Sequence, residues 1–129
     1  MKRDKFIKIV EDAFEAIPEK FRSLLSNVQI VVEDEANKVQ RQKVHASPGS
    51  LIFGLYEGIP QTKRGMGYSG VLPDKITIFQ KPIEFVAGDD KEKIKEIVND
   101  AVYHEIAHHF GTGEERIRQI EIRRKNKDN

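Results

Sequence analysis

The apolar residues of the chain recur with two different spacings, which predict helices and strands. Residues 4–17 carry apolar side chains at helical spacing and are followed by Pro18, so an amphipathic helix is expected there. Apolar and polar residues alternate over 28–32, and β-branched residues are frequent over 76–79, as in strands. Residues 51–56 form a further candidate strand. The pattern therefore predicts an opening helix and three strands.

A long helical pattern follows the third strand. Apolar residues recur at helical spacing from Ile94 to Ala101, and Asp89 with Glu92 forms a pattern similar to a capping box at the helix start. Residues 114–125 show a second helical pattern. Together these elements predict an α+β fold, in which a small twisted sheet of about three strands, largely antiparallel or mixed, is packed by helices.

The polar stretches between these elements are interpreted as loops. Residues 34–47 are expected to form a loop or a frayed hairpin, with His45 on the surface. Pro82 is expected to close the third strand or to mark a sheet edge, since proline cannot donate a backbone hydrogen bond. Residues 63–70 are rich in glycine and are expected to form a surface loop.

Composition and charge limit the functional classes. A chain of 129 residues fits a single domain spanning 1–129. A net charge of +1 gives no reason to expect nucleic acid or an anionic membrane as the main partner. Cysteine is absent, which excludes disulfides and thiolate metal ligands. The acids among the N-terminal apolar residues and the lack of a membrane-length apolar run predict a cytoplasmic location, whereas no pattern indicates the oligomeric state.

The residues with the clearest chemistry are His104, Glu105 and His108, in the pattern His-Glu-x-x-His. Two histidines four apart on a helix lie about 40° from one another around its axis, so both imidazoles can reach one ion. Zinc accepts imidazole nitrogens and carboxylate oxygens, and a catalytic zinc keeps one position for water. Glu105 lies beside the ligands and can act as a base towards that water. His104 and His108 are therefore expected to bind Zn²⁺, with Glu105 as the catalytic residue.

A third protein ligand is expected shortly after the helix. Gly111 favours the end of the helix, so the chain can turn back towards the metal, and Glu114 is the candidate ligand. An alternative is that Thr112 caps a further helix, in which case Glu114 is an ordinary acid of the first turn, and Glu115 is a less favoured ligand candidate. His109 projects about 100° away from His108 around the helix and is expected to hydrogen-bond behind the ligands instead of binding metal.

The motif residues and several other segments carry a family resemblance. His104, Glu105, His108, Gly111 and Glu114 are similar to the extended zinc-binding pattern of metzincin-type peptidases, in which Glu114 would usually be a histidine or an aspartate. More closely, the chain resembles a small bacterial family of minimal zincin-like metallopeptidases. The segments that carry this likeness are 27–34, 54–58, 72–79 and the His-His-Phe-Gly run at 108–111. No methionine follows the motif, so the Met-turn of full metzincins is absent.

These observations favour a zinc-dependent peptidase whose substrate is a peptide or protein. Zinc would polarise the scissile carbonyl and lower the pKa of a water, and Glu105 would take the proton of that water and deliver it to the leaving amine. The substrate is expected to lie extended beside residues 51–56. Two alternatives remain open. One is a zinc-stabilised binding or regulatory protein with vestigial activity. The other is a metal-dependent RNA hydrolase, and Glu105 argues against it because the enzymes that it would resemble usually carry three histidines and no glutamate after the first.

Overall fold

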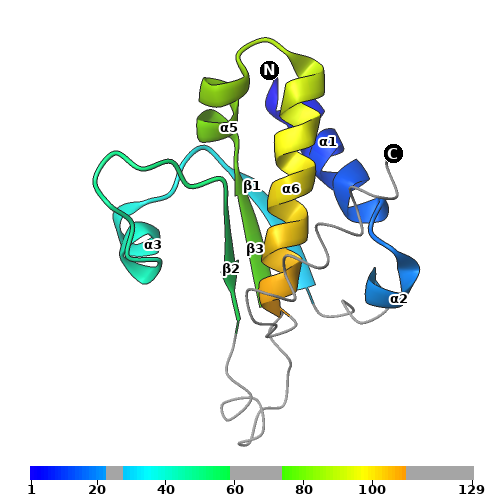
Figure 1. Cartoon of the computed structure of the whole chain (residues 1–129), viewed down its shortest axis with the longest axis horizontal. Coiled ribbons are helices and arrows are strands. Elements are labelled where there is room, and N and C mark those ends of the chain that lie inside the picture. Colours follow the sequence, from blue (N-terminus) through cyan, green and yellow to red (C-terminus); the bar gives the residue numbers. More distant parts are fainter. Residues whose placement is uncertain (23–27, 59–73, 110–129) are drawn as a thin grey trace, which may run out of the picture.

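The described part of the chain is a three-stranded sheet with helices packed against it (Figure 1). The computed structural model describes residues 1–22, 28–58 and 74–109. Within this part the strands follow the order β1-β3-β2. Their bounds are β1 Val28–Glu33, β2 Gly54–Glu57 and β3 Asp74–Phe79. The third strand in the sequence is therefore the central strand of the described sheet.

The sheet is mixed, as the sequence allowed. β1 is parallel to β3, with Ile30 opposite Ile76, and β2 is antiparallel to β3, with Tyr56 opposite Ile76. A strand with neighbours on both sides is commonly buried on both faces and is therefore rich in apolar residues. β3 follows this rule, because Ile76 and Ile78 on one face and Phe79 on the other are fully buried. The second strand begins at Gly54 and ends at Glu57, whereas the sequence predicts a strand over residues 51–56.

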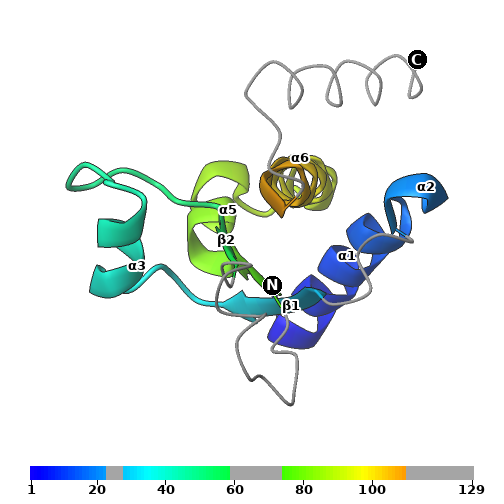
Figure 2. The same cartoon turned by 90° about the horizontal axis from the view of Figure 1, so that it is seen from below.

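Helices account for most of the remaining described residues. Their bounds are α1 Arg3–Glu15, α2 Glu19–Arg22, α3 Lys38–Lys43, α5 Gln80–Ala87 and α6 Lys91–His109. α1 and α6 pack against one another on the same face of the sheet (Figures 1 and 2). α6 also packs against β2, β3 and α5. This α+β arrangement confirms the predicted fold class.

The core lies between α1, α6 and the sheet. Phe6 and Val10 come from α1, Ile76 and Ile78 from β3, and Val98 from α6, and each is almost completely buried. Apolar residues of α6 recur at helical spacing, and this periodicity gives the helix one continuous buried face. This packing fixes the position of α6, and with it the position of the His-Glu-x-x-His motif.

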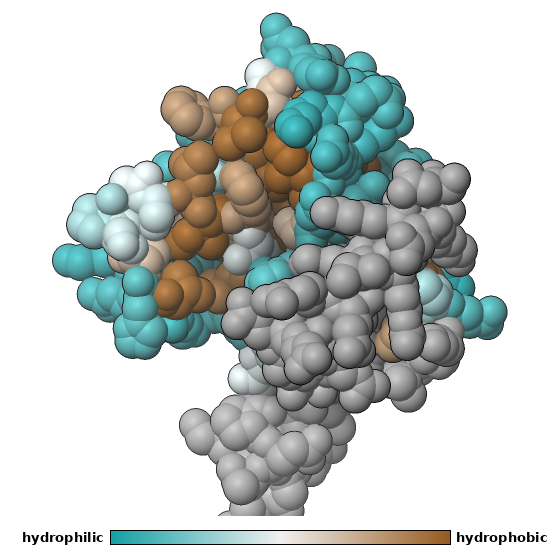
Figure 3. Space-filling view, in the orientation of Figure 1, coloured by the Kyte–Doolittle hydropathy of each residue, from teal (hydrophilic) through white to brown (hydrophobic). Residues whose placement is uncertain are grey.

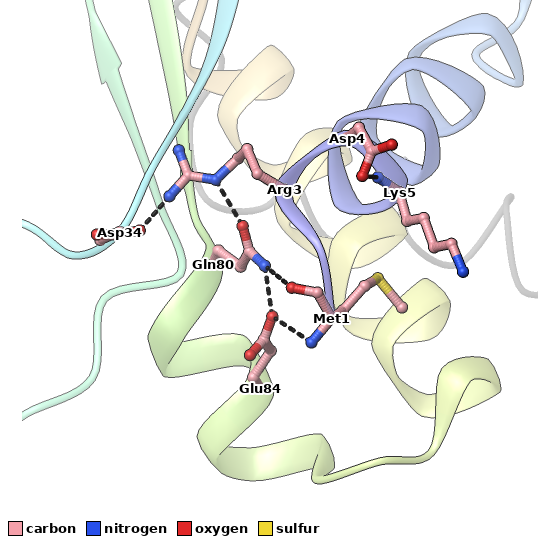
Figure 4. Close-up of polar contacts among 7 residues, drawn as sticks. All are labelled: Met1, Arg3, Asp4, Lys5, Asp34, Gln80 and Glu84. Atoms are coloured by element: carbon pink, nitrogen blue, oxygen red, sulfur yellow. Dashed lines mark hydrogen bonds and ion pairs between the residues drawn. The ribbon is translucent and has the colours of Figure 1, made fainter.

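A polar network joins the N-terminus to α5 and to the end of β1 (Figure 4). Gln80 is at its centre: its amide nitrogen donates to the Met1 carbonyl oxygen at 2.9 Å, and its amide oxygen accepts a hydrogen bond from Arg3 Nε at 2.7 Å. Arg3 also pairs with Asp34, and the Met1 amino group lies 3.5 Å from Glu84 Oε1. These contacts attach the start of α1 to the element that precedes α6.

Two expectations about the polar stretches are wrong. Residues 34–47 contain α3 and are not a simple loop or hairpin, because Asn37 and Gln40 form a reciprocal capping box with hydrogen bonds of 2.8 and 2.9 Å. Pro82 does not mark a sheet edge, since β3 is central. It occupies the first turn of α5, where a backbone N–H has no intrahelical partner to lose.

The start of α6 and the exposure of His45 test two further predictions from the sequence. α6 is capped by Asp90, whose Oδ1 accepts from the Lys93 backbone N–H at 3.1 Å, and not by Asp89 as its sequence suggested. His45 is exposed, as predicted. The glycine-rich segment 63–70 and the predicted helix 114–125 lie outside the described residues. Among the described helices, none is both long enough and apolar enough to cross a membrane.

Candidate active site

Helix α6 carries His104 and Glu105, and these neighbouring residues differ in their exposure to solvent. His104 is exposed, whereas Glu105 is only 8% exposed. Val102 and Ile106, on the packed side of the helix, are buried. The imidazole of His104 is thus accessible at the surface, and the carboxylate beside it is enclosed by the protein.

Glu105 is enclosed by β2, which is an edge strand of the described sheet. The Glu105 Cγ atom lies so close to Gly54 that a Cβ atom on this glycine would be only 3.1 Å away from it. Two residues further along β2, the backbone N–H of Tyr56 donates a hydrogen bond to the Glu105 carboxylate. The carboxylate therefore sits against the backbone of β2 and is held by a donor from the strand.

Burial changes the acidity of Glu105. Loss of contact with water penalises the charged form and raises the pKa of the Glu105 carboxyl, whereas the nearby His104 and the Tyr56 N–H act in the opposite direction. The effect of burial prevails, so the pKa lies above the ordinary value for a glutamate. A raised carboxyl pKa is a common property of groups that exchange protons in catalysis.

A pocket of about 600 Å³ opens beside these residues, between β2 and α6. Its apolar lining comes from three places: the segment before β2, the strand itself and the middle of α6. The residues involved include Val44, Leu51, Phe53, Ile97 and Ala101. Asp100, His104 and Glu105 supply its polar groups. Figure 3 shows apolar side chains gathered on this face of the molecule. The pocket can therefore hold an apolar group immediately beside the motif.

The predicted ligand set falls partly outside the described residues. The backbone of His108 and His109 belongs to α6, but their side chains are not described, and Gly111 and Glu114 lie beyond residue 109. Among the described residues, no group of three histidine, cysteine or acidic side chains is placed to hold a metal. The structure thus brings His104 and Glu105 together, while the roles of His108, Glu114 and His109 stay predictions.

The chemistry of the described residues fits a zinc site. The accessible imidazole of His104 is the kind of donor that zinc prefers, and the chain has no thiol that would compete for the metal. The neighbouring Glu105 is held against β2, which is suitable for a carboxylate that serves as a base without binding the metal. His108, Glu114 or both would have to complete such a site.

Comparison with known proteins identifies a family and a similar fold. A family model for zincin-like metallopeptidases matches residues 25–124, a segment that contains all three strands and the motif. The chain belongs to this family. A conserved hypothetical protein from Thermus thermophilus has a similar structure, with a TM-score of 0.58, 24% sequence identity, and coverage of 85% of this chain and 94% of that one. That likeness concerns the fold alone, and no curated protein matches the chain.

Sequence patterns did not reveal every residue of this zincin-like site. The Gly-Leu-Tyr-Glu-Gly segment at 54–58 contributed to the family resemblance, but no role could be given to Gly54 or Tyr56. Their contacts with Glu105 depend on how β2 packs against α6. Tyr103, which directly precedes the motif, packs against the core.

Proposed function

We propose that the chain is a zinc-dependent peptidase in which Glu105 is the general base. The observation that carries the proposal is the placement of Glu105, which is buried against an edge strand, adjoins an accessible histidine and lines an apolar pocket. Membership of the zincin-like metallopeptidase family supports the same reaction class.

His104, His108 and Glu114 would hold the metal. A bound zinc ion supplies a Lewis acid that polarises the scissile carbonyl and makes a water more acidic. Glu105 accepts a proton from the water whose oxygen attacks the carbonyl carbon. As the C–N bond breaks, Glu105 passes that proton to the leaving amine. The raised pKa of Glu105 suits both steps, because a carboxyl that holds its proton more tightly is a better proton acceptor for the water and can still pass the proton to the amine.

The substrate would bind as an extended chain along β2. The Phe79 N–H donates to the Phe53 carbonyl oxygen at 2.9 Å, which makes these opposite residues a hydrogen-bonded pair. Because such pairs alternate with non-hydrogen-bonded pairs, the backbone groups of Gly54 and the carbonyl of Tyr56 point away from β3, on the edge where the Tyr56 N–H binds Glu105. A peptide could pair with this edge, as in other complexes formed by strand addition. A side chain of the peptide would then enter the neighbouring pocket.

The first experiment combines metal analysis with peptide cleavage. We expect about one zinc per chain in untagged protein, and loss or weakening of zinc binding in Glu114→Ala. Glu105→Gln should retain zinc but cleave a peptide library about 10²- to 10⁴-fold more slowly than wild type. Wild-type protein without tightly bound metal would contradict the proposed metal site.

The variants also separate catalysis from binding. Identical cleavage profiles for wild type and Glu105→Gln would remove Glu105 from its catalytic role and would favour a zinc-stabilised binding protein. Glu96→Gln, which alters an exposed acid of the same helix, is the matched control and should cleave like wild type.

A further inference from the structure

Gly54 occupies a position at which a side chain would collide with its neighbours. A Cβ atom there would lie 3.1 Å from Glu105 Cγ, 3.3 Å from Ile78 Cδ1 and 3.4 Å from the Thr77 carbonyl oxygen. The first two distances are shorter than most Cβ contacts in proteins. Gly54 does not have a positive φ, in contrast to Gly49 and Gly88. The absence of a side chain at this position therefore provides space and is not needed for backbone conformation.

The neighbours of Gly54 differ in how easily they can move. Ile78 is completely buried in the core, and the Thr77 carbonyl belongs to the backbone of the central strand. Densely packed core groups cannot shift without loss of packing elsewhere. The Glu105 side chain lies at the border of the pocket and has several rotatable bonds. An added methyl group on residue 54 would therefore displace Glu105 first.

The position of Cγ determines whether the carboxylate reaches its donor. Residues 54 and 56 lie on the same side of β2, because side chains alternate along a strand. Glu105 packs over the first of these residues and accepts the hydrogen bond from the backbone N–H of the second. A shift of Cγ away from β2 would draw the carboxylate away from the Tyr56 N–H.

We propose that Gly54 is a positioning residue that acts through Glu105. Its missing side chain allows the carboxylate to rest against β2, where the strand fixes its orientation. This inference rests on the proposed role of Glu105 as general base. A bulkier residue 54 leaves the zinc ligands in place but holds the base in a different orientation.

The contact can be measured without any assay of activity. In Glu105→Ala we expect amide hydrogen exchange at Tyr56, followed by NMR, to become about tenfold faster or more, as expected for loss of a hydrogen bond to a charged group. Gly54→Ala should have a similar effect. The double variant should show no further increase, because both changes remove the same interaction. Wild-type exchange at Tyr56 in Gly54→Ala would overturn the proposal.

Two further variants separate this effect from general destabilisation. Gly88→Ala places a side chain at a positive φ where no atom lies within 4 Å, so it strains the backbone without touching Glu105. It should leave the ratio of Tyr56 exchange to global exchange unchanged. If Gly54→Ala folds poorly, Ile78→Val can be added to remove the Cδ1 atom that faces the new methyl group. Exchange at Tyr56 should then still be faster than in Ile78→Val alone.

Turnover provides the second test. Gly54→Ala should lower kcat about tenfold or more, since misplacement of a catalytic group by a fraction of an ångström has effects of this order. Its KM should stay within about twofold of the wild-type value and its zinc content should be unchanged. Faster Tyr56 exchange with unchanged kcat would overturn the positioning role. A wild-type protein that cleaves no peptide would contradict the proposed function, while the exchange experiment would still decide whether Gly54 positions Glu105.

Discussion

The Tyr56 hydroxyl donates a hydrogen bond to Asp74 Oδ2 at 2.7 Å. This contact joins the edge strand β2 to the first residue of the central strand β3, and the Asp74 side chain is buried. The same tyrosine provides the backbone N–H that binds Glu105. Tyr56 therefore connects the central strand of the sheet to the Glu105 carboxylate in the candidate active site.

Tyr56→Phe should destabilise the protein while leaving the backbone N–H in place. Removal of the hydroxyl eliminates a hydrogen bond to a buried carboxylate, an interaction that contributes about 1.5–3 kcal/mol. Urea unfolding followed by circular dichroism would measure the change in the free energy of unfolding. Unchanged stability would mean that water or another group replaces the hydroxyl.

Glu105→Gln should stabilise the metal-free protein at neutral pH more than at acidic pH. Burial raises the pKa of Glu105 in the folded state, so the folded protein holds this proton more tightly than the unfolded chain does. Stability is consequently lost as pH rises from the ordinary glutamate pKa through the folded-state pKa. The difference in Tm between the variant and wild type should grow from pH 4 to pH 7 in the presence of a chelator. A constant difference would contradict this linkage.

Leu51→Asp should weaken cleavage of peptides that carry a large apolar residue near the scissile bond. Leu51 lines the pocket and is 47% exposed, so the substitution changes the lining with little effect on the core. We expect kcat/KM for such peptides to fall about tenfold relative to peptides with alanine at that position. Val39→Asp, at an exposed position of α3 that does not line the pocket, is the control. Equal losses for both peptide types would argue against a specificity role for the pocket.

Phe6→Ala should destabilise the fold by about 3–5 kcal/mol, since it removes a large side chain from the fully buried core between α1 and α6. The adjacent Ile7, which is 38% exposed, offers a matched control, and Ile7→Ala should have a much smaller effect. Chemical denaturation of both variants would compare them directly. Similar losses of stability in the two variants would indicate that the buried face of α1 does not hold this helix in place.

The sequence predicted α6 well because its signals are local. The spacing of apolar residues from Ile94 to Ala101 correctly predicted a helix there, and the motif required His104 at an accessible position. A local signal for α3 was also present in Asn37 and Gln40, but the surrounding polar residues led to its interpretation as a loop. The fold class and the three strands were therefore predictable, whereas short helices within polar stretches were missed.

The enclosure of Glu105 was not predictable in the same way. It results from the approach of β2 to α6, two elements that are distant in the sequence, and no periodicity reports the distance between Gly54 and the Glu105 side chain. The Gly-Leu-Tyr-Glu-Gly segment indicated only that this strand resembled those of related proteins. The predicted ligands His108 and Glu114 still depend on the metal and mutation experiments.

The central place of β3 has a consequence for the order in which the chain can fold during synthesis. Within the described sheet, β1 and β2 each pair with β3 and not with each other, and β3 follows both of them in the sequence. Because ribosomes release the chain from its N-terminus, neither strand has its sheet partner until β3 has emerged. Sheet assembly must therefore wait until more than half of the 129 residues have been synthesised.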